Sequence, residues 1–144
     1  MALNGQQITI IGAGIAGLAV ARALALRGGL VTVLERAAAV SEVGAGLQIS
    51  PNGAAVLRGL GLGAALDAAS VRAVAVALTD GLTGHVVTRL EVGRLRPDQG
   101  WHFIHRADLI DLLLDGAVQA GVTVRTGQAV QSVDLTGAAS QRSR

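Results

Sequence analysis

Two short, mostly apolar runs near the start of the chain, Gln7–Ile11 and Leu30–Leu34, flank a stretch with helical periodicity. Short β-branched runs are typical of parallel strands buried on both faces. We expect the helix between them to continue to about Arg27, with Gly17 and Ala21 on the face that meets the sheet. The pattern therefore predicts a βαβ unit with a right-handed crossover.

The middle of the chain follows a different pattern. Residues 37–50 show no regular periodicity, and Pro51 begins a short helix that runs through Leu57. Two runs typical of strands, 71–79 and 85–92, are separated by the turn sequence Asp80-Gly81-Leu82-Thr83-Gly84, which predicts an antiparallel hairpin. A polar loop is expected over residues 94–100.

The last third returns to the first pattern. An amphipathic helix is predicted from Arg106 to Ala120, followed by a strand at 122–124 and another at 129–135. The whole chain is therefore of the α/β class, a Rossmann-like βαβ fold with a small added hairpin. The expected segments are a dinucleotide-binding part with its following loop, a hairpin, a return helix with strands, and a frayed tail: 1–70, 71–100, 101–136 and 137–144.

A glycine-rich turn joins the first strand to the first helix, with the sequence Gly12-Ala13-Gly14-Ile15-Ala16-Gly17. Gly12 permits a tight turn, Gly14 allows a pyrophosphate to approach the backbone, and Gly17 allows the helix to pack closely on the strand. The first turn of the helix, including Ile15 and Ala16, then offers free N–H groups and positive dipole charge to phosphate.

The second strand ends in Glu35, 18 residues after Gly17, which is close to the spacing of a ribose-binding acid. A carboxylate there accepts hydrogen bonds from a ribose diol and disfavours a 2′-phosphate, because two negative groups would be desolvated together. The alternative is a surface glutamate after a plain glycine turn. The residues alone leave NAD and FAD open as ligands.

Three further stretches carry a resemblance to a known family. They are Val43-Gly44-Ala45-Gly46-Leu47-Gln48-Ile49-Ser50-Pro51-Asn52-Gly53, Leu60-Gly61-Leu62 and His105-Arg106-Ala107-Asp108-Leu109. Together with the glycine turn and Glu35-Arg36, they resemble the N-terminal part of single-component FAD-dependent aromatic monooxygenases, salicylate and 3-hydroxybenzoate hydroxylases in particular. The resemblance spans nearly residues 6–136.

The resemblance implies roles for individual residues. Glu35 would hold the adenosine ribose, Arg36 would lie along the adenine, and the main chain of Val130 would meet the adenine. Gly46, Leu47 and Gln48 would border the flavin. Arg106 would reach the ribityl-pyrophosphate region, and arginine suits phosphate; an exposed Arg106 balanced by Asp108 is the alternative.

The resemblance also implies a longer protein, since an Ala-Asp-Gly-x-x-Ser stretch and a Gly-Asp pair of the family do not occur here. The implied activity is NAD(P)H-dependent hydroxylation of a small phenolic substrate with FAD as cofactor. No residue of the 144 is expected to be catalytic. A stand-alone NAD- or FAD-binding module and a truncated product without turnover remain as alternatives.

Composition narrows the remaining classes. All 12 basic residues are arginine, the net charge is only +2, and Trp101 and Phe103 are the only aromatic residues. A nucleic-acid-binding protein would cluster its positive charge and offer aromatic side chains for base stacking, so no nucleic-acid partner is expected. Cysteine is absent, and His102 with His105 is too few ligands for a metal site. Arg22 and the glycine turn interrupt the apolar stretch from Ile8 to Leu26, so we expect a cytoplasmic protein without a membrane span.

Overall fold

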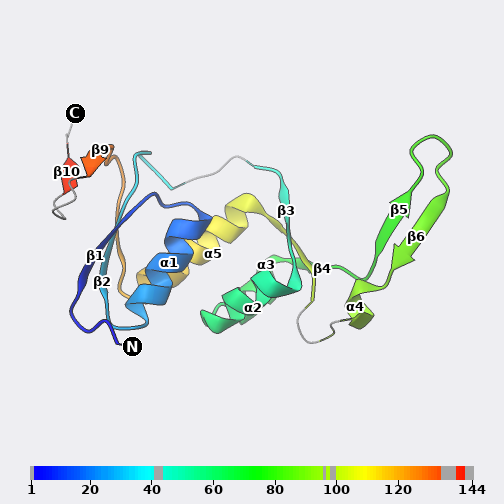
Figure 1. The fold of residues 1–144 in the computed structure, drawn as a ribbon, viewed down its shortest axis with the longest axis horizontal. Coiled ribbons are helices and arrows are strands. Elements are labelled where there is room, and N and C mark those ends of the chain that lie inside the picture. The colour runs from blue at the N-terminus through cyan, green and yellow to red at the C-terminus, as the bar shows by residue number, and fades with distance from the viewer. Residues whose placement is uncertain (1, 41–43, 96, 98–99, 134–138, 142–144) are drawn as a thin grey trace. The chain divides into compact units, whose positions relative to one another are not determined.

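The computed structural model describes residues 2–40, 44–95, 97, 100–133 and 139–141 (Figure 1). The chain divides into two compact units. Unit 1 comprises Met1–Val43 and Leu109–Arg144, and unit 2 comprises Gly44–Asp108. These divisions differ from the segment boundaries expected at 70 and 100, because unit 2 combines the stretch after Gly44 with the hairpin.

Unit 1 is built on a parallel sheet of three strands in the order β1-β2-β8. Its strands are β1 (Gln7–Ile11), β2 (Leu30–Leu34) and β8 (Thr123–Arg125). The first two have the bounds predicted from the apolar runs, with Gln7 opposite Leu30 and Ile11 opposite Leu34. Parallel neighbours need a crossover, and helix α1 provides it between β1 and β2.

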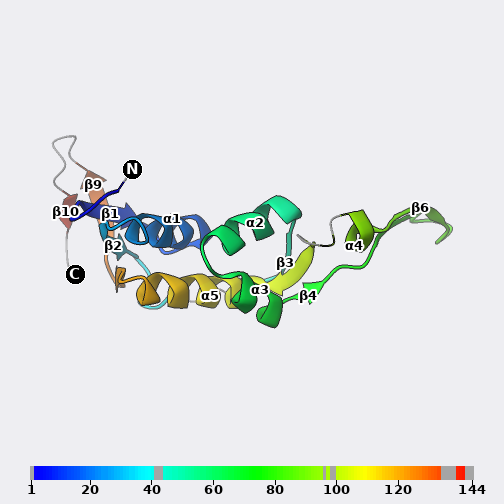
Figure 2. The same cartoon turned by 90° about the horizontal axis from the view of Figure 1, so that it is seen from below.

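Helix α1 (Ile15–Ala25) lies with α5 (Arg106–Gln119) on one face of this sheet, and the two views agree on that arrangement (Figure 2). The helix α1 ends two residues before the expected Arg27. Leu18 and Ala21 of α1 are fully buried, as are Val33 of the sheet and Leu113 of α5. These four side chains form the centre of the apolar core of unit 1.

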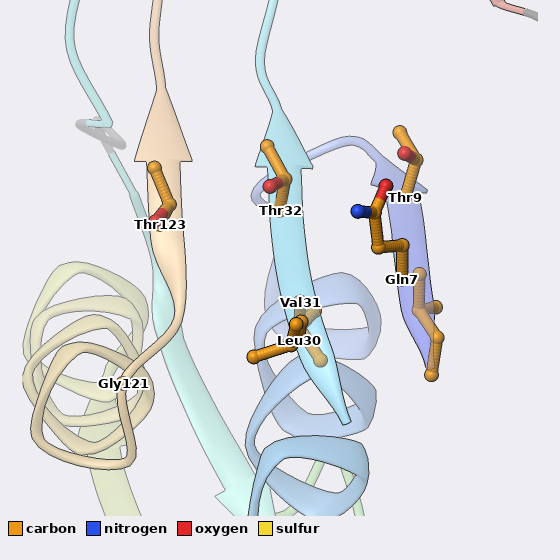
Figure 3. A pocket seen from close by; sticks show the side chains of 8 residues that line it. Gln7, Thr9, Leu30, Val31, Thr32, Gly121 and Thr123 are labelled. Carbon is orange, nitrogen blue, oxygen red and sulfur yellow. The ribbon is translucent and has the colours of Figure 1, made fainter. Parts of the chain in front are cut away.

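The opposite face of the sheet is exposed along β1, so the expectation that β1 is buried on both faces is wrong. Residues of β1 alternate between exposed and half-buried, and Ile11 and Leu30 are 55% and 60% exposed. Figure 3 shows Thr9, Thr32 and Thr123 in a row across the three strands, in agreement with their register. The alternation is that of a sheet covered on one face only, at least within the described residues.

Unit 2 holds an antiparallel sheet in the order β3-β7-β4 and helices that the sequence pattern predicts only in part. Its elements are β3 (Gly46–Ile49), α2 (Pro51–Gly59), α3 (Gly63–Ala69), β4 (Val71–Arg72) and β7 (His102–His105). The irregular stretch expected at 37–50 contains β3, and neither β7 nor α3 was predicted. The strands β3 and β7 are each four residues long, and their pairing joins positions more than 50 residues apart in the chain.

The expected strand at 71–79 is two strands. Val71–Arg72 pairs with β7, whereas β5 (Val76–Thr79) pairs with β6 (Val86–Leu90) in the predicted antiparallel hairpin. Asp80 closes the turn by accepting hydrogen bonds from the backbone N–H groups of Leu82 and Thr83 at 3.0 and 2.7 Å. A short helix, α4 (Val92–Leu95), overlaps the start of the expected polar loop.

The C-terminal region contains β9 (Val130–Val133), which pairs in antiparallel fashion with β10 (Ala139–Gln141). The prediction of a frayed tail over 137–144 is therefore wrong for residues 139–141, where pairing with β9 supplies the order that the local sequence does not indicate. Positions 137, 138 and 142–144 lie outside the described residues, as do 134 and 135 of the expected strand.

Candidate functional site

The glycine turn follows β1 and leads directly into α1. Gly12 has a φ of +98°, which L side chains rarely adopt, and its N–H donates to the carbonyl of Leu34 at 2.8 Å. A Cβ on Gly17 would lie 2.0 Å from the carbonyl oxygen of Gly12. Both positions therefore require glycine for the turn itself, whatever the ligand.

Gly14 has a different role in the same turn. It caps α1 without any side-chain hydrogen bond, and its φ of −78° is accessible to every residue. Among the described residues, no atom lies within 4 Å of the point where its Cβ would be. The first turn that follows begins with Ile15, Ala16 and Gly17, whose N–H groups have no acceptor within the helix. Open space beside Gly14 and backbone N–H donors without a helical acceptor therefore lie together at the N-terminus of α1.

Glu35 stands at the end of β2, against the glycine turn. One carboxylate oxygen, Oε2, accepts the N–H of Ala13 at 2.7 Å, and the other, Oε1, accepts the N–H of Ala37 at 2.9 Å. The hydrogen bond from Ala37, then that from Ala13, lowers the pKa of Glu35 below its usual value, with a smaller contribution from the charge of Arg36, although partial burial opposes the shift. The side chain is an oriented anion with lone pairs still available.

Backbone hydrogen bonds hold the segment after β8 beside Glu35. The N–H of Glu35 donates to Arg125 at 2.8 Å, and the N–H of Gln128 donates to the carbonyl of Glu35 at 2.8 Å. Parallel pairing therefore continues beyond the ends of both strands. It brings Val130, 95 positions from Glu35 in the sequence, to the same edge of the sheet.

Two hollows flank Glu35. One, of about 400 Å³, is lined by residues of the turn, of the end of β2 and of the segment after β8: Ile11, Gly12, Leu34, Glu35, Arg36, Gln128, Ala129, Val130 and Gln131. The other, of about 220 Å³, is lined by Ala13, Gly14, Glu35, Arg36, Ala37, Ala39, Val40 and Ile110. The structure thus brings together the predicted residues Gly12, Gly14, Glu35, Arg36 and Val130.

Gln128, Ala129 and Gln131 are lining residues that the sequence did not indicate. No spacing rule connects them to the glycine turn, because their position depends on the pairing of β2 with β8. A weak signal existed in the return of a short β-branched run, Val122-Thr123-Val124, which predicts a third parallel strand.

The predicted residues Ile15, Ala16 and Gly17 lie in the first turn of α1, and the remaining four belong to unit 2. Gly46, Leu47 and Gln48 are part of β3 and line a hollow of about 400 Å³ with Phe103, His105 and Asp108, among others. Arg106 begins α5, is half-buried, and donates its backbone N–H to Ala45 at 3.3 Å. A Cβ on Gly44 would lie 3.0 Å from the Cβ of Arg106, so the arginine lies directly against the start of this segment.

A separate groove of about 340 Å³ lies on the open sheet face and is lined near the amino ends of β1 and β2 (Figure 3). Open α/β sheets bind ligands at the carboxyl ends of their strands, where Gly12 and Glu35 stand. This groove is therefore not the candidate site. Within the described residues, no three metal-ligating side chains gather, and no helix has the length and apolar character needed to cross a bilayer.

The βαβ unit, the glycine turn at a helix start and the acid at the end of β2 define a dinucleotide-binding domain of the Rossmann type. Comparison with known protein families gives a more particular result. Residues 6–142 match the model of the FAD binding domain family, and the chain belongs to that family.

Two of the relatives are named for the hydroxylation of hydroxybenzoates. The chain is 43% identical over 122 residues to 3-amino-4-hydroxybenzoate 2-monooxygenase of Streptomyces cremeus, a match that covers 80% of this chain and 31% of the relative. It is 37% identical over 117 residues to 3-hydroxybenzoate 6-hydroxylase of Polaromonas naphthalenivorans, covering 79% and 29%. The chain thus spans about a third of the length of these relatives.

A solved structure confirms the fold. The tetrameric form of 2-methyl-3-hydroxypyridine-5-carboxylic acid oxygenase superposes with a TM-score of 0.81 at 24% identity, covering 95% of this chain and 37% of that one. The Rossmann-like fold and the FAD family expected from the sequence are therefore confirmed.

The residues present fit the cofactor of the family. FAD contains an adenosine diol, a pyrophosphate and a flavin. The open space over Gly14 would be filled by any Cβ, and the adjacent first turn supplies N–H donors suited to a pyrophosphate. The oriented carboxylate of Glu35 suits a diol.

Proposed function

We propose that this chain holds FAD and represents the N-terminal part of an NAD(P)H-dependent hydroxylase of small phenolic substrates. The observation that carries the proposal is the placement of Glu35. Its carboxylate is bound by the N–H of Ala13 within the glycine turn, and a hollow that reaches Val130 lies beside it. A surface glutamate after an ordinary turn would have no such partner.

In this proposal, each residue binds or orients, and none reacts. Gly12, Gly14 and Gly17 shape the turn, and the N–H groups of Ile15 and Ala16 face the pyrophosphate. Glu35 accepts hydrogen bonds from the adenosine ribose, because an oriented anion is the strongest acceptor available there. We assign the adenine to the hollow of about 400 Å³, which is lined by Arg36 and Val130 among others.

The residues of unit 2 are assigned to the other half of the cofactor. Gly46, Leu47 and Gln48 would border the flavin, and Arg106 would approach the ribityl-pyrophosphate region, where its charge favours phosphate. When bound, FAD supplies the redox chemistry, taking up a hydride from NAD(P)H and activating oxygen for ring hydroxylation.

The substrate class rests on the relatives, whose names contain hydroxybenzoates and an aminohydroxybenzoate. A soluble cytoplasmic location belongs to the same proposal, since NAD(P)H is a cytoplasmic reductant. A second candidate is a module that binds a dinucleotide without turnover, since the family model that residues 6–142 match is a cofactor-binding domain.

The first test is a titration of the purified chain with FAD and, separately, with NAD, followed by flavin absorbance and by thermal stability. We expect FAD to bind, and Glu35→Gln to weaken it about 10- to 100-fold, since hydrogen bonds to a charged group contribute about 1.5–3 kcal/mol. Glu91→Gln is the matched control, because the Glu91 carboxylate pairs with Arg89 in unit 2 at 2.6 Å and lines none of the hollows described above. Stabilisation by NAD with no flavin bound would overturn the proposal.

A further inference from the structure

His102 stands at the start of β7 and is only 1% exposed. Its Nδ1 atom lies 2.9 Å from the hydroxyl oxygen of Ser70, which directly follows α3. The same hydroxyl donates to the carbonyl of Leu66 at 2.5 Å. Burying a polar side chain costs free energy unless it is hydrogen-bonded, so the hydrogen bond to Ser70 offsets the cost of burying His102.

The hydroxyl of Ser70 determines which nitrogen of His102 carries a proton. A hydroxyl has one proton, and here Leu66 receives it. Ser70 must therefore accept, and Nδ1 of His102 must be the donor. The other ring nitrogen, Nε2, faces Asp67 at 3.9 Å, and Asp67 also pairs with Arg58 at 3.1 Å.

Ser70, His102 and Asp67 have the residue types of a hydrolytic triad but not its geometry. In such triads the serine meets Nε2 and the acid meets Nδ1, whereas here the two are exchanged. The hydroxyl is also committed to a backbone carbonyl and the ring is buried. The arrangement is therefore suited to holding a strand in place and not to nucleophilic attack.

The strand that His102 holds sits between two others. His102 is the register partner of Ile49 in β3 and of Arg72 in β4. The next three pairs along β3 and β7 are Phe103 with Gln48, Ile104 with Leu47, and His105 with Gly46. Any shift of β7 along its axis is thus transmitted, pair by pair, to Gly46–Gln48.

We propose that His102, through its hydrogen bond to Ser70, positions β7 and thereby the segment Gly46–Gln48 for the flavin half of FAD. This inference rests on the proposed function, in which that segment borders the flavin. His102 is a positioning residue: it is 1% exposed, it is not among the residues that line the hollow at Gly46–Gln48, and it acts through β7.

The test uses the fact that ADP is the adenosine-pyrophosphate half of FAD, whose proposed partners other than Arg106 lie in unit 1. His102→Leu and Ser70→Ala each remove the hydrogen bond. We expect FAD affinity to fall about tenfold in both, because one buried polar group loses its partner, while ADP affinity falls much less. His102→Asn, whose amide N–H can take the place of Nδ1–H, should recover most of the FAD affinity and the wild-type circular dichroism of the bound flavin.

The control is His85→Leu, at an exposed position of the hairpin, which should alter neither affinity. Equal losses of FAD and ADP affinity in His102→Leu, or no rescue by asparagine, would overturn the positioning role while leaving FAD binding established. A wild-type chain that binds ADP but not FAD would instead overturn the proposed function and this inference with it.

Discussion

The glycine-turn end of unit 1 and the β5–β6 hairpin of unit 2 are organised in opposite ways. Around Glu35, hydrogen bonds join residues far apart in the chain: Ala13, Arg125 and Gln128 all bond to it. In the hairpin, every residue from Val76 to Leu90 is exposed, and Asp80 bonds only to near neighbours.

The difference indicates which region of the chain is stabilised by contacts within the described residues. The glycine-turn end of unit 1 packs on a buried apolar core, and its polar groups form hydrogen bonds with one another. The hairpin carries Val76, Leu78 and Leu90, all exposed to solvent within the described part of the chain. Two-stranded hairpins are marginal without further packing, so the hairpin should be the weaker region. The following predictions test that contrast, beginning with the largest effect.

The same truncation should have unequal effects in the two regions. Leu18→Ala removes a fully buried side chain of α1 and should lower the free energy of unfolding by about 2–5 kcal/mol. Leu78→Ala in the hairpin, where the side chain is 59% exposed, should change it by less than about 0.5 kcal/mol. Urea denaturation followed by circular dichroism measures both. Similar losses in the two variants would show that the hairpin is packed after all.

Alanine substitutions at two glycines of the same turn should distinguish an effect on folding stability from an effect on FAD binding. Gly17→Ala places a Cβ 2.0 Å from the carbonyl oxygen of Gly12, and we expect a loss of about 1–3 kcal/mol in stability together with loss of FAD binding. Gly14→Ala places its Cβ more than 4 Å from the other described residues apart from its chain neighbours, so it should fold normally. It should bind FAD more weakly, because the added Cβ would take up the space that we assign to the pyrophosphate. Denaturation and FAD titration of both variants test this. Normal FAD affinity in Gly14→Ala would argue against a pyrophosphate at that position.

The acid dependence of stability should be the smallest effect, and it compares one carboxylate from each region. Backbone N–H groups lower the pKa of Glu35, whose usual value is 4.5, and of Asp80, whose usual value is 3.8. The unfolded chain therefore binds more protons than the folded chain just below these values. Their stabilising contributions are complete above the usual values and are lost as pH falls through the lowered ones.

Glu35→Gln should therefore flatten the loss of stability below pH 4.5, because the titrating group is removed. Asp80→Asn should have a weaker effect, since Asp80 is fully exposed and solvent screens its interactions. Denaturation midpoints across the acid range measure both slopes. A steeper slope for Glu35→Gln would reverse the sign and contradict the bonding found around Glu35.

How far the sequence predicts the structure depends on whether the decisive interactions are local. The bounds of β1 and β2 follow from their apolar runs, and α5 was expected within one residue of its end. The glycine turn and Glu35 were found by spacing. Each of these signals lies within a stretch of fewer than 30 residues.

The interactions that were missed are non-local. β3 contains a glycine and only four residues, and it becomes a strand because His102–His105 pairs with it. The half-exposed face of β1 was missed because an apolar run does not reveal how many of its faces are covered. The bond between Ser70 and His102 joins residues 32 apart, and no local pattern marks it.

The two backbone hydrogen bonds to Glu35 have a consequence for attempts to redesign the ligand preference of this domain. Accepting a 2′-phosphate would require removal of the acid, and removal would leave the N–H groups of Ala13 and Ala37 without their acceptor. One of those groups belongs to the glycine turn itself. In the proposed function, recognition of the ribose and integrity of the turn therefore depend on the same side chain. A variant that accepts a 2′-phosphate must supply a new hydrogen-bond acceptor for Ala13 and Ala37 as well as a cation for the phosphate.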